Sequence, residues 1–168
     1  KYLEEQKAAG NVPDDEAAPN FFVVMLVGMS DPGLIILPTH RLVSGLPAVT
    51  GEQMRAAIAG HFEVVGEFGP DATACWEHLE MDGNQNVLGF GTVADGQWFA
   101  VKLRDASVMS ALAPDQSADW RALAVSILHK LVLDKLVPEK VGGTAACKYV
   151  HLMQEVTDAV AAKECQLA

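Results

Sequence analysis

Three consecutive polar residues, Thr39, His40 and Arg41, carry the side chains best suited to chemistry in this chain of 168 residues. The guanidinium of Arg41 offers a planar fork of donors that suits a phosphate or a carboxylate. The imidazole of His40 can donate, accept or shuttle a proton near neutral pH, and Thr39 adds a hydroxyl. The pattern predicts an anion-binding site formed by Thr39 and Arg41, with His40 and Arg41 as catalytic candidates.

A purely structural role for the same residues is the alternative. Successive side chains of a strand point to opposite faces, so His40 and Arg41 can share a ligand only where the strand is interrupted, which Pro38 favours. In the structural alternative, Arg41 pairs with a carboxylate across the sheet and His40 caps a turn. Asp31 is a further ligand-binding candidate, although hydrogen bonds within its own Ser-Asp-Pro-Gly turn suffice to explain it.

Composition excludes several classes of function. The formal net charge of −10 argues against nucleic acid and against anionic membrane surfaces as partners. The longest apolar run, Phe21–Met29, is far shorter than the ~20 residues of a transmembrane helix. Three widely spaced cysteines form no metal-ligand motif, so we expect no metal site and reduced thiols in the cytoplasm. No nucleotide-binding glycine motif occurs, which leaves any cofactor unknown.

The elements that would position these residues follow from periodicity and turn chemistry. The apolar stretch 21–30 predicts a central strand, and the turn after it predicts an antiparallel return through 34–37. Thr50 and Gln53 have the spacing of a capping box at the start of a helix. Further expected elements are helices over 1–9, 71–81 and 153–163 and strands over 62–68 and 148–152.

Two longer segments complete the expected fold. Asp95-Gly96 predicts a two-residue hairpin turn, with Gly89 and Gly91 leaving flat backbone on one face of the outgoing strand. Residues 117–137 predict one long amphipathic helix that Pro138 ends. Hairpins with helices between them indicate an α+β fold with a largely antiparallel sheet and four to five helices. Residues 1–20 are expected to be a helix end and loop, and 21–168 a single domain.

Three stretches in this order resemble the bacterial family called domain of unknown function 1015. They are "MSDPGLIILPTHRLV", "DGQWFAVKL" and "DWRALAVSILHKLVLDKL" followed by "KYVH". The resemblance covers Phe21 to the end, and it implies that the chain is the C-terminal half of a longer protein. Family members carry an N-terminal half ending in Ala-Asp-Gly-His-His-Arg, which is similar to the nucleotide-site turn of ParB, sulfiredoxin and ADP-dependent serine kinases.

Two functions are therefore compared below. In the first, the chain is part of an enzyme that binds a nucleotide or another phosphorylated small molecule, with phosphoryl transfer implied by the resemblance of the upstream motif. In the second, it is a non-catalytic module for homo-oligomerisation or protein interaction through an exposed sheet face around Gly89 and Gly91.

Overall fold

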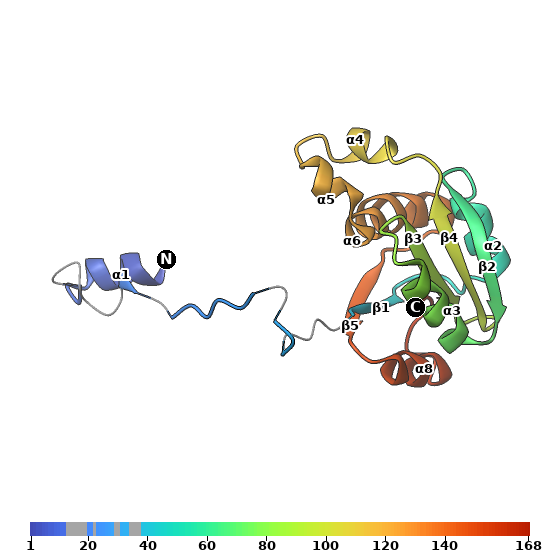
Figure 1. Cartoon of the computed structure of the whole chain (residues 1–168), viewed down its shortest axis with the longest axis horizontal. Helices are drawn as coiled ribbons and strands as arrows, with labels where there is room; N and C mark the ends of the chain where they lie inside the picture. The colour runs from blue at the N-terminus through green and yellow to red at the C-terminus, as the bar shows by residue number, and fades with distance from the viewer. Residues whose placement is uncertain (13–19, 22, 29–30, 34–37) are drawn as a thin grey trace. The chain divides into compact units, whose positions relative to one another are not determined.

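The computed structural model consists of two separate units, Lys1–Ile36 and Leu37–Ala168, and each is considered by itself (Figure 1). The second unit begins 16 residues after the expected domain start at residue 21. The residues that the structure describes are 1–12, 20–21, 23–28, 31–33 and 38–168.

The first unit contains helix α1 (Tyr2–Ala8), which agrees with the helix predicted over 1–9. The strand predicted over 21–30 is wrong for the described part of that stretch, because residues 21 and 23–28 have no strand conformation. Val23 and Leu26 are 99% and 91% exposed, so their apolar character does not mark a buried strand in this chain. The return strand predicted over 34–37 lies outside the described residues.

The second unit is built on two antiparallel groups of strands, which confirms the α+β class (Figure 1). β1 (His40–Ser44) pairs with β5 (Ala146–Val150). The other group has the order β2-β4-β3, in which β2 is Phe62–Gly69, β3 is Val87–Thr92 and β4 is Gln97–Leu103. Leu167 bridges the two groups, because it pairs with Val43 of β1 and with Thr92 of β3.

The β3–β4 hairpin has a longer connection than the predicted two-residue turn. Thr92 pairs with Gln97, so four residues make the loop, and of these Gly96 alone has a positive φ, +67°. A two-residue type I′ turn would need positive φ at both central positions. The side chain of Asp95 stabilises the longer loop by accepting a hydrogen bond from the Thr92 hydroxyl at 2.6 Å.

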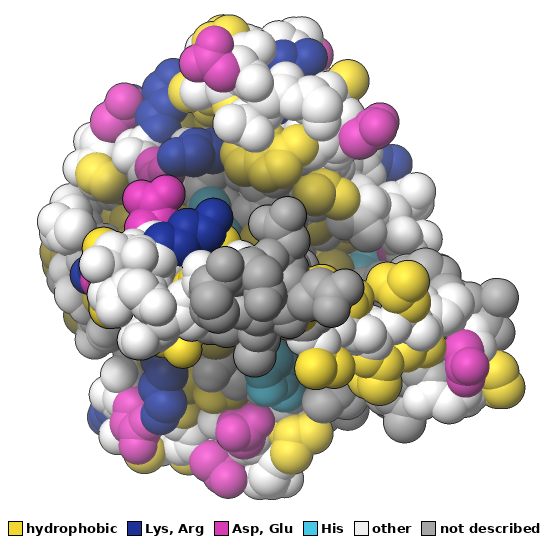
Figure 2. Space-filling model, turned by 90° about the vertical axis from the view of Figure 1, so that its left-hand side faces the viewer, with side chains coloured by type: hydrophobic (Ala, Val, Ile, Leu, Met, Phe, Trp, Pro, Cys, Tyr) yellow, Lys and Arg dark blue, Asp and Glu magenta, His cyan; other side chains and the backbone are white. Residues whose placement is uncertain are grey.

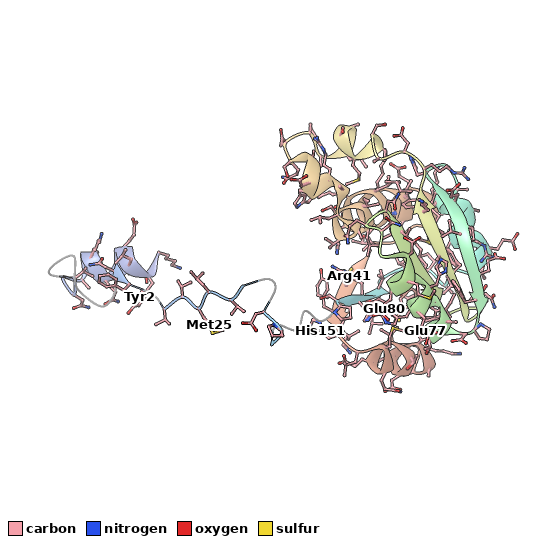
Figure 3. The ribbon with its side chains drawn as sticks, in the orientation of Figure 1. Tyr2, Met25, Arg41, Glu77, Glu80 and His151 are labelled. Atoms are coloured by element: carbon pink, nitrogen blue, oxygen red, sulfur yellow. The ribbon has the colours of Figure 1, made fainter. Side chains whose placement is uncertain are left out.

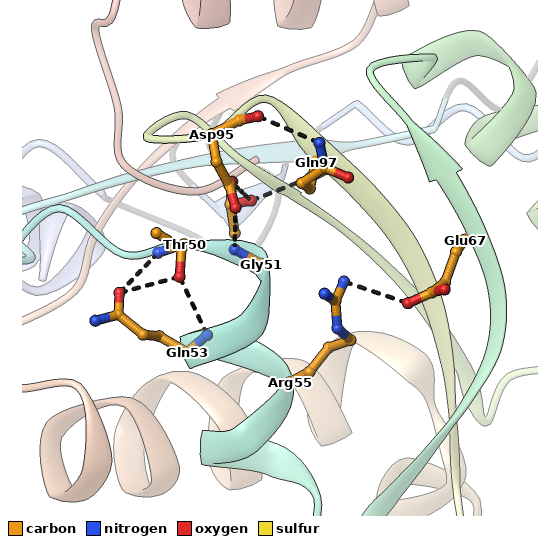
Figure 4. Close-up of polar contacts among 8 residues, drawn as sticks. Thr50, Gly51, Gln53, Arg55, Glu67, Asp95 and Gln97 are labelled. Atoms are coloured by element: carbon orange, nitrogen blue, oxygen red, sulfur yellow. Dashed lines mark hydrogen bonds and ion pairs between the residues drawn. The ribbon is translucent and has the colours of Figure 1, made fainter.

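The same aspartate connects the hairpin to helix α2 (Gly51–Ile58). Its other oxygen accepts a hydrogen bond from the Gly51 amide at the first turn of the helix (Figure 4). The predicted capping box is confirmed, since Thr50 accepts from the Gln53 amide and Gln53 accepts from the Thr50 amide. These bonds satisfy helix amides that would otherwise lack partners.

The single helix predicted over 117–137 is wrong. It is divided into α5 (Ala118–Ala122), α6 (Ala124–Ser126), the π-helix η2 (Ile127–Leu136) and α7 (Val137–Lys140). The break is at Leu123, whose ψ of 136° is extended, and the Ala124 amide that follows donates to the side chain of Gln85. Pro138 does not end the helix, because it is the second residue of α7, which continues to Lys140.

The helices predicted over 71–81 and 153–163 agree with the structure within a few residues, whereas the short helix after β4 was not predicted. α3 is Ala72–Asp82, with Asp71 as its N-cap and Gly83 in the left-handed conformation at its end. α8 is Met153–Ala161, and the short α4 (Val108–Leu112) follows β4. Among the described residues, no helix is both long and apolar enough to cross a membrane.

Two groups of buried side chains pack on opposite faces of the strands. One contains Phe62, Phe99 and Leu131 and includes η2, whereas the other contains Leu42, Cys75 and Val156 and lies under α3 and α8. Helices therefore cover both faces near β1 and β3, which is the region that forms the candidate site.

Candidate functional site

A cavity of about 230 Å³ lies in the second unit, where the residues before and at the start of β1 approach the start of β3. Its walls are largely apolar and come from both buried groups. α3 contributes Cys75, Trp76 and Leu79, and β1 with the residue before it contributes Thr39, His40 and Arg41. The other lining residues are Val43, Ala72, Val87–Phe90, Trp98, Ala124, Val125, Leu128, Leu133, Met153, Val156, Leu167 and Ala168.

The strand arrangement explains why a cavity forms at this place. The C-terminal residues lie between β1 and β3, where Leu167 bonds to Val43 and Ala168 bonds to Gly91 (Figure 1). Two residues nearer the N-terminus of each strand, at Arg41 and Gly89, no such bond to a described residue is formed. The cavity occupies that position.

β1 begins at His40, so Pro38 and Thr39 precede the strand. The side chains alternate as expected: Arg41 pairs across to Tyr149, whereas His40 packs against Trp76 of α3. Even so, both residues line the same cavity, because it extends along the open edge of the strand. Thr39, His40 and Arg41 are thus brought together around one space.

Arg41 has no carboxylate partner among the described residues, which contradicts the structural alternative. Its guanidinium lies 5.6 Å from the centre of the Tyr149 ring and donates to the carbonyl of Thr39. Its Nε atom is buried and has no hydrogen-bond partner in the described part of the chain. A charged group in such surroundings gains free energy from an added anion that accepts its remaining donors.

The positive charge of Arg41 also affects its neighbours. His129 of η2 stacks on Tyr149, with the ring centres 6.5 Å apart. Burial lowers the pKa of His129, and the charge of Arg41 lowers it further. The face that carries Arg41 therefore favours negative over positive charge.

His40 is half-buried on the other side of β1. Its ring meets the Trp76 ring edge-on, with centres 4.8 Å apart, and its Nε2 is buried without a partner among the described residues. Burial, then Arg41 and His151, lowers the pKa of His40. His40 is consequently neutral at pH 7 and able to accept a proton, and the predicted turn-capping role is not seen.

Three residues of the site were not predicted from the sequence. They are Trp76, Tyr149 and His151, none of which is marked by its local sequence as part of a site. His151 follows the strand residue paired with His40, and its Nδ1 lies 3.0 Å from the carbonyl of Pro38; Figure 3 labels it with Arg41. The pairing of β1 with β5 brings these residues together, and no local pattern indicates it.

Asp31 belongs to the first unit, where its hydrogen bonds stabilise its own turn. Its Oδ1 accepts a hydrogen bond from the Gly33 amide at 2.8 Å, and its amide donates to Gly28. A ligand-binding role for Asp31 stays a prediction.

No group of three or more His, Cys, Asp or Glu residues in the described ranges is placed to hold a metal ion. On the face shown in Figure 2, Lys and Arg side chains are interspersed with Asp and Glu and form no continuous basic patch. The cysteines are free thiols, and burial raises the pKa of Cys75, in the cavity wall, to about 11. Cys75 is thus protonated at neutral pH.

A family model described as "Protein of unknown function (DUF1015)" matches residues 1–126. The chain belongs to this family. No curated protein and no solved structure matches it.

Proposed function

We propose that this member of the DUF1015 family binds a small molecule with an anionic group, such as a nucleotide or another phosphorylated compound, in the cavity beside β1. The observation that carries the proposal is the half-buried guanidinium of Arg41, which has no carboxylate partner among the described residues. Arg41 would hold the anion, and the Thr39 hydroxyl would add a donor. The apolar walls would surround the uncharged part of the molecule.

The same arrangement of Arg41 and His40 also supports a catalytic role for this chain. We propose that the chain is the C-terminal half of a longer enzyme and that the reaction is a phosphoryl transfer, by analogy with the upstream family motif. Arg41 would stabilise charge on the transferred group, and neutral His40 would accept a proton from the attacking hydroxyl. His40 suits this role because its lowered pKa favours the neutral imidazole at pH 7, which has one ring nitrogen free to accept a proton.

Titration calorimetry on the whole chain tests the anion site. The probes are inorganic phosphate, AMP and ATP, each titrated into the wild type, Arg41→Gln and Arg104→Gln. Arg104→Gln is the matched control. It removes the same charge, but Arg104 lies outside the cavity, beside Glu63. We expect Arg41→Gln to weaken binding by about tenfold or more, since a charge-assisted hydrogen bond is lost.

Two results would contradict the proposal. One is equal affinity of the wild type and Arg41→Gln for a probe that binds. The other is the absence of binding of all three probes to the wild type at millimolar concentration.

The alternative function needs a correction. The sheet face around Gly89 and Gly91 is not exposed, because α3 lies over Gly89 and the Trp98 ring lies over Gly91. This packing gives an interaction module at this face less support than the anion site, and the module stays the alternative function. The backbone edge of the same strand is a different feature and is considered next.

A further inference from the structure

The cavity has two open backbone edges that face each other. The backbone amide and carbonyl of Val43 in β1 both form hydrogen bonds with Leu167. The amide and carbonyl of Gly91 in β3 both form hydrogen bonds with Ala168. Backbone groups two residues apart on a strand point to the same side. The amide and carbonyl of Arg41 and of Gly89 therefore point into the cavity.

These four groups have no backbone partner among the described residues. Arg41 lies opposite Tyr149 in a pair that does not exchange hydrogen bonds, because its groups point away from β5. Gly89 likewise points away from β4. Neighbouring strands lie about 4.8 Å apart, so two strands that flank a third leave a gap about one strand wide.

We propose that this gap is a slot for an extended apolar peptide, which binds as a strand antiparallel to both β1 and β3. The direction follows from Gln166–Ala168, which already runs antiparallel to both strands at the closed end of the slot. The first docked residue would exchange two hydrogen bonds with Arg41, and the second would exchange two with Gly89. This is the binding mode in which main-chain bonds give affinity and side-chain pockets give specificity.

The walls indicate the side chains of the peptide. The first and third residues would point to the side of Phe90, Leu88 and Leu128, which is apolar apart from the Arg41 side chain. The second would point toward α3, beside His40, Trp76 and Leu79, where Leu79 and Cys75 already pack close to Gly89. A strand buried on both faces needs consecutive apolar residues, so we infer three in a row.

The inference goes beyond the anion site, because it uses the backbone of Arg41 and not its side chain. Arg41→Gln should weaken phosphate binding by about tenfold or more, whereas it keeps the backbone amide and carbonyl that would pair with the peptide. The two proposals can therefore fail independently.

The test uses the whole chain labelled with ¹⁵N and the peptide acetyl-Phe-Val-Leu-Thr-amide at up to about 10 mM. We expect chemical-shift changes at the Arg41 and Gly89 amides and slower hydrogen exchange of both. The control peptide has the same side chains but carries N-methyl groups on its first two residues, which removes their donors. We expect it to have less than a tenth of the effect on exchange.

A second arm appends Phe-Val-Leu-Thr directly after Ala168, which raises the effective concentration of the same strand. Its control has Pro at the first two appended positions. Slower exchange of Arg41 and Gly89 in either arm, relative to its control, supports the slot.

Three outcomes would overturn it. One is no protection in either arm, and a second is equal protection by the control sequences, which would mean that the cavity takes apolar groups without strand pairing. The third is a concentration-dependent dimer that protects both amides without any peptide, because the occupant would then be a second copy of the chain.

Discussion

The two strands that border the cavity differ in what supports them. β3 pairs with β4 on one side and lies under α3, and its glycines are in close contact with neighbouring side chains. β1 pairs with the short β5 and carries Arg41 and His40, each with a buried nitrogen that lacks a partner among the described residues. The side of the cavity formed by β3, here called the β3 wall, is therefore closely packed. The side formed by β1, the β1 wall, retains polar groups at a cost in stability.

Because of this difference, we expect the β3 wall to determine the stability of the fold and the β1 wall to determine ligand binding. Unpaired buried polar groups destabilise a folded protein, and they persist where a ligand satisfies them. Substitutions in the β3 wall should thus lower stability, and substitutions in the β1 wall should change binding at little cost in stability. The predictions below test this contrast.

Cysteine reactivity should show the largest difference. Cys75 in the wall behind β3 has a pKa of about 11, compared with an ordinary value of 9.0, because burial disfavours the thiolate. At pH 8 we expect Cys75 to be alkylated by iodoacetamide about 100-fold more slowly than a free thiol, in line with its smaller thiolate fraction. Mass spectrometry of timed digests measures the rates, and Cys147 of β5, which is less buried, serves as the internal comparison and should react faster. Equal rates at the two cysteines would mean that the β3 wall opens readily.

Gly91→Ala should destabilise the β3 wall strongly. A Cβ at this position would lie 2.5 Å from Cη2 of Trp98, whose ring is buried and cannot easily move. We expect the free energy of unfolding to fall by about 1–3 kcal/mol, the usual cost of overpacking. Urea denaturation measures it, with Gly60→Ala as the control, because a Cβ at Gly60 would meet no atom within 4 Å. A Gly91→Ala protein as stable as that control would contradict close packing at β3.

Arg41→Met should behave in the opposite way. Methionine keeps an apolar chain of similar length over Tyr149 and removes the buried Nε that lacks a partner among the described residues. We expect the free energy of unfolding to change by less than about 1 kcal/mol, or to rise, because replacing an unpaired buried polar group is often neutral or stabilising. The same urea titration measures it without ligand. A loss as large as that of Gly91→Ala would mean that Arg41 is structural.

The features that were predictable from the sequence are local ones. The Thr50–Gln53 capping box, the α3 and α8 helices and the β3–β4 hairpin all follow from residues near each other in the chain. The capping box depends on two side chains three residues apart, so its prediction needs no knowledge of the fold.

The features that were not predictable depend on distant residues. The break at Leu123 is accompanied by a bond from Ala124 to Gln85, 39 positions earlier, which no helical period reveals. Apolar residues around Val23 suggested a buried strand, but burial depends on a partner that the sequence pattern does not specify. The site shows the same division: His40 and Arg41 stood out by residue type, whereas their contacts with Trp76 and Tyr149 arise only from tertiary pairing.

The smallest expected effect concerns the pH dependence of the β1 wall. His40 and His129 have lowered pKa values, mainly through burial, and His40 also faces Arg41, His151 and Glu155. Between their folded pKa values and about 6.5, the unfolded chain binds more protons than the folded one. Stability should therefore rise with pH across that window, be fully present above it and decline as the pH falls below about 6.5.

Urea denaturation between pH 5 and pH 7.5 measures this slope. Carboxylates with lowered pKa values, such as Glu155, lose their contribution at lower pH, so they affect this window little. His40→Gln should reduce the slope, because one of the two half-buried imidazoles no longer resists protonation. His61→Gln should leave it unchanged, since His61 lies outside the cavity and both shifted histidines remain. If His40→Gln kept the wild-type slope, the His40 ring would be fully accessible to water, and its pKa would not be lowered as its proposed role as a base requires.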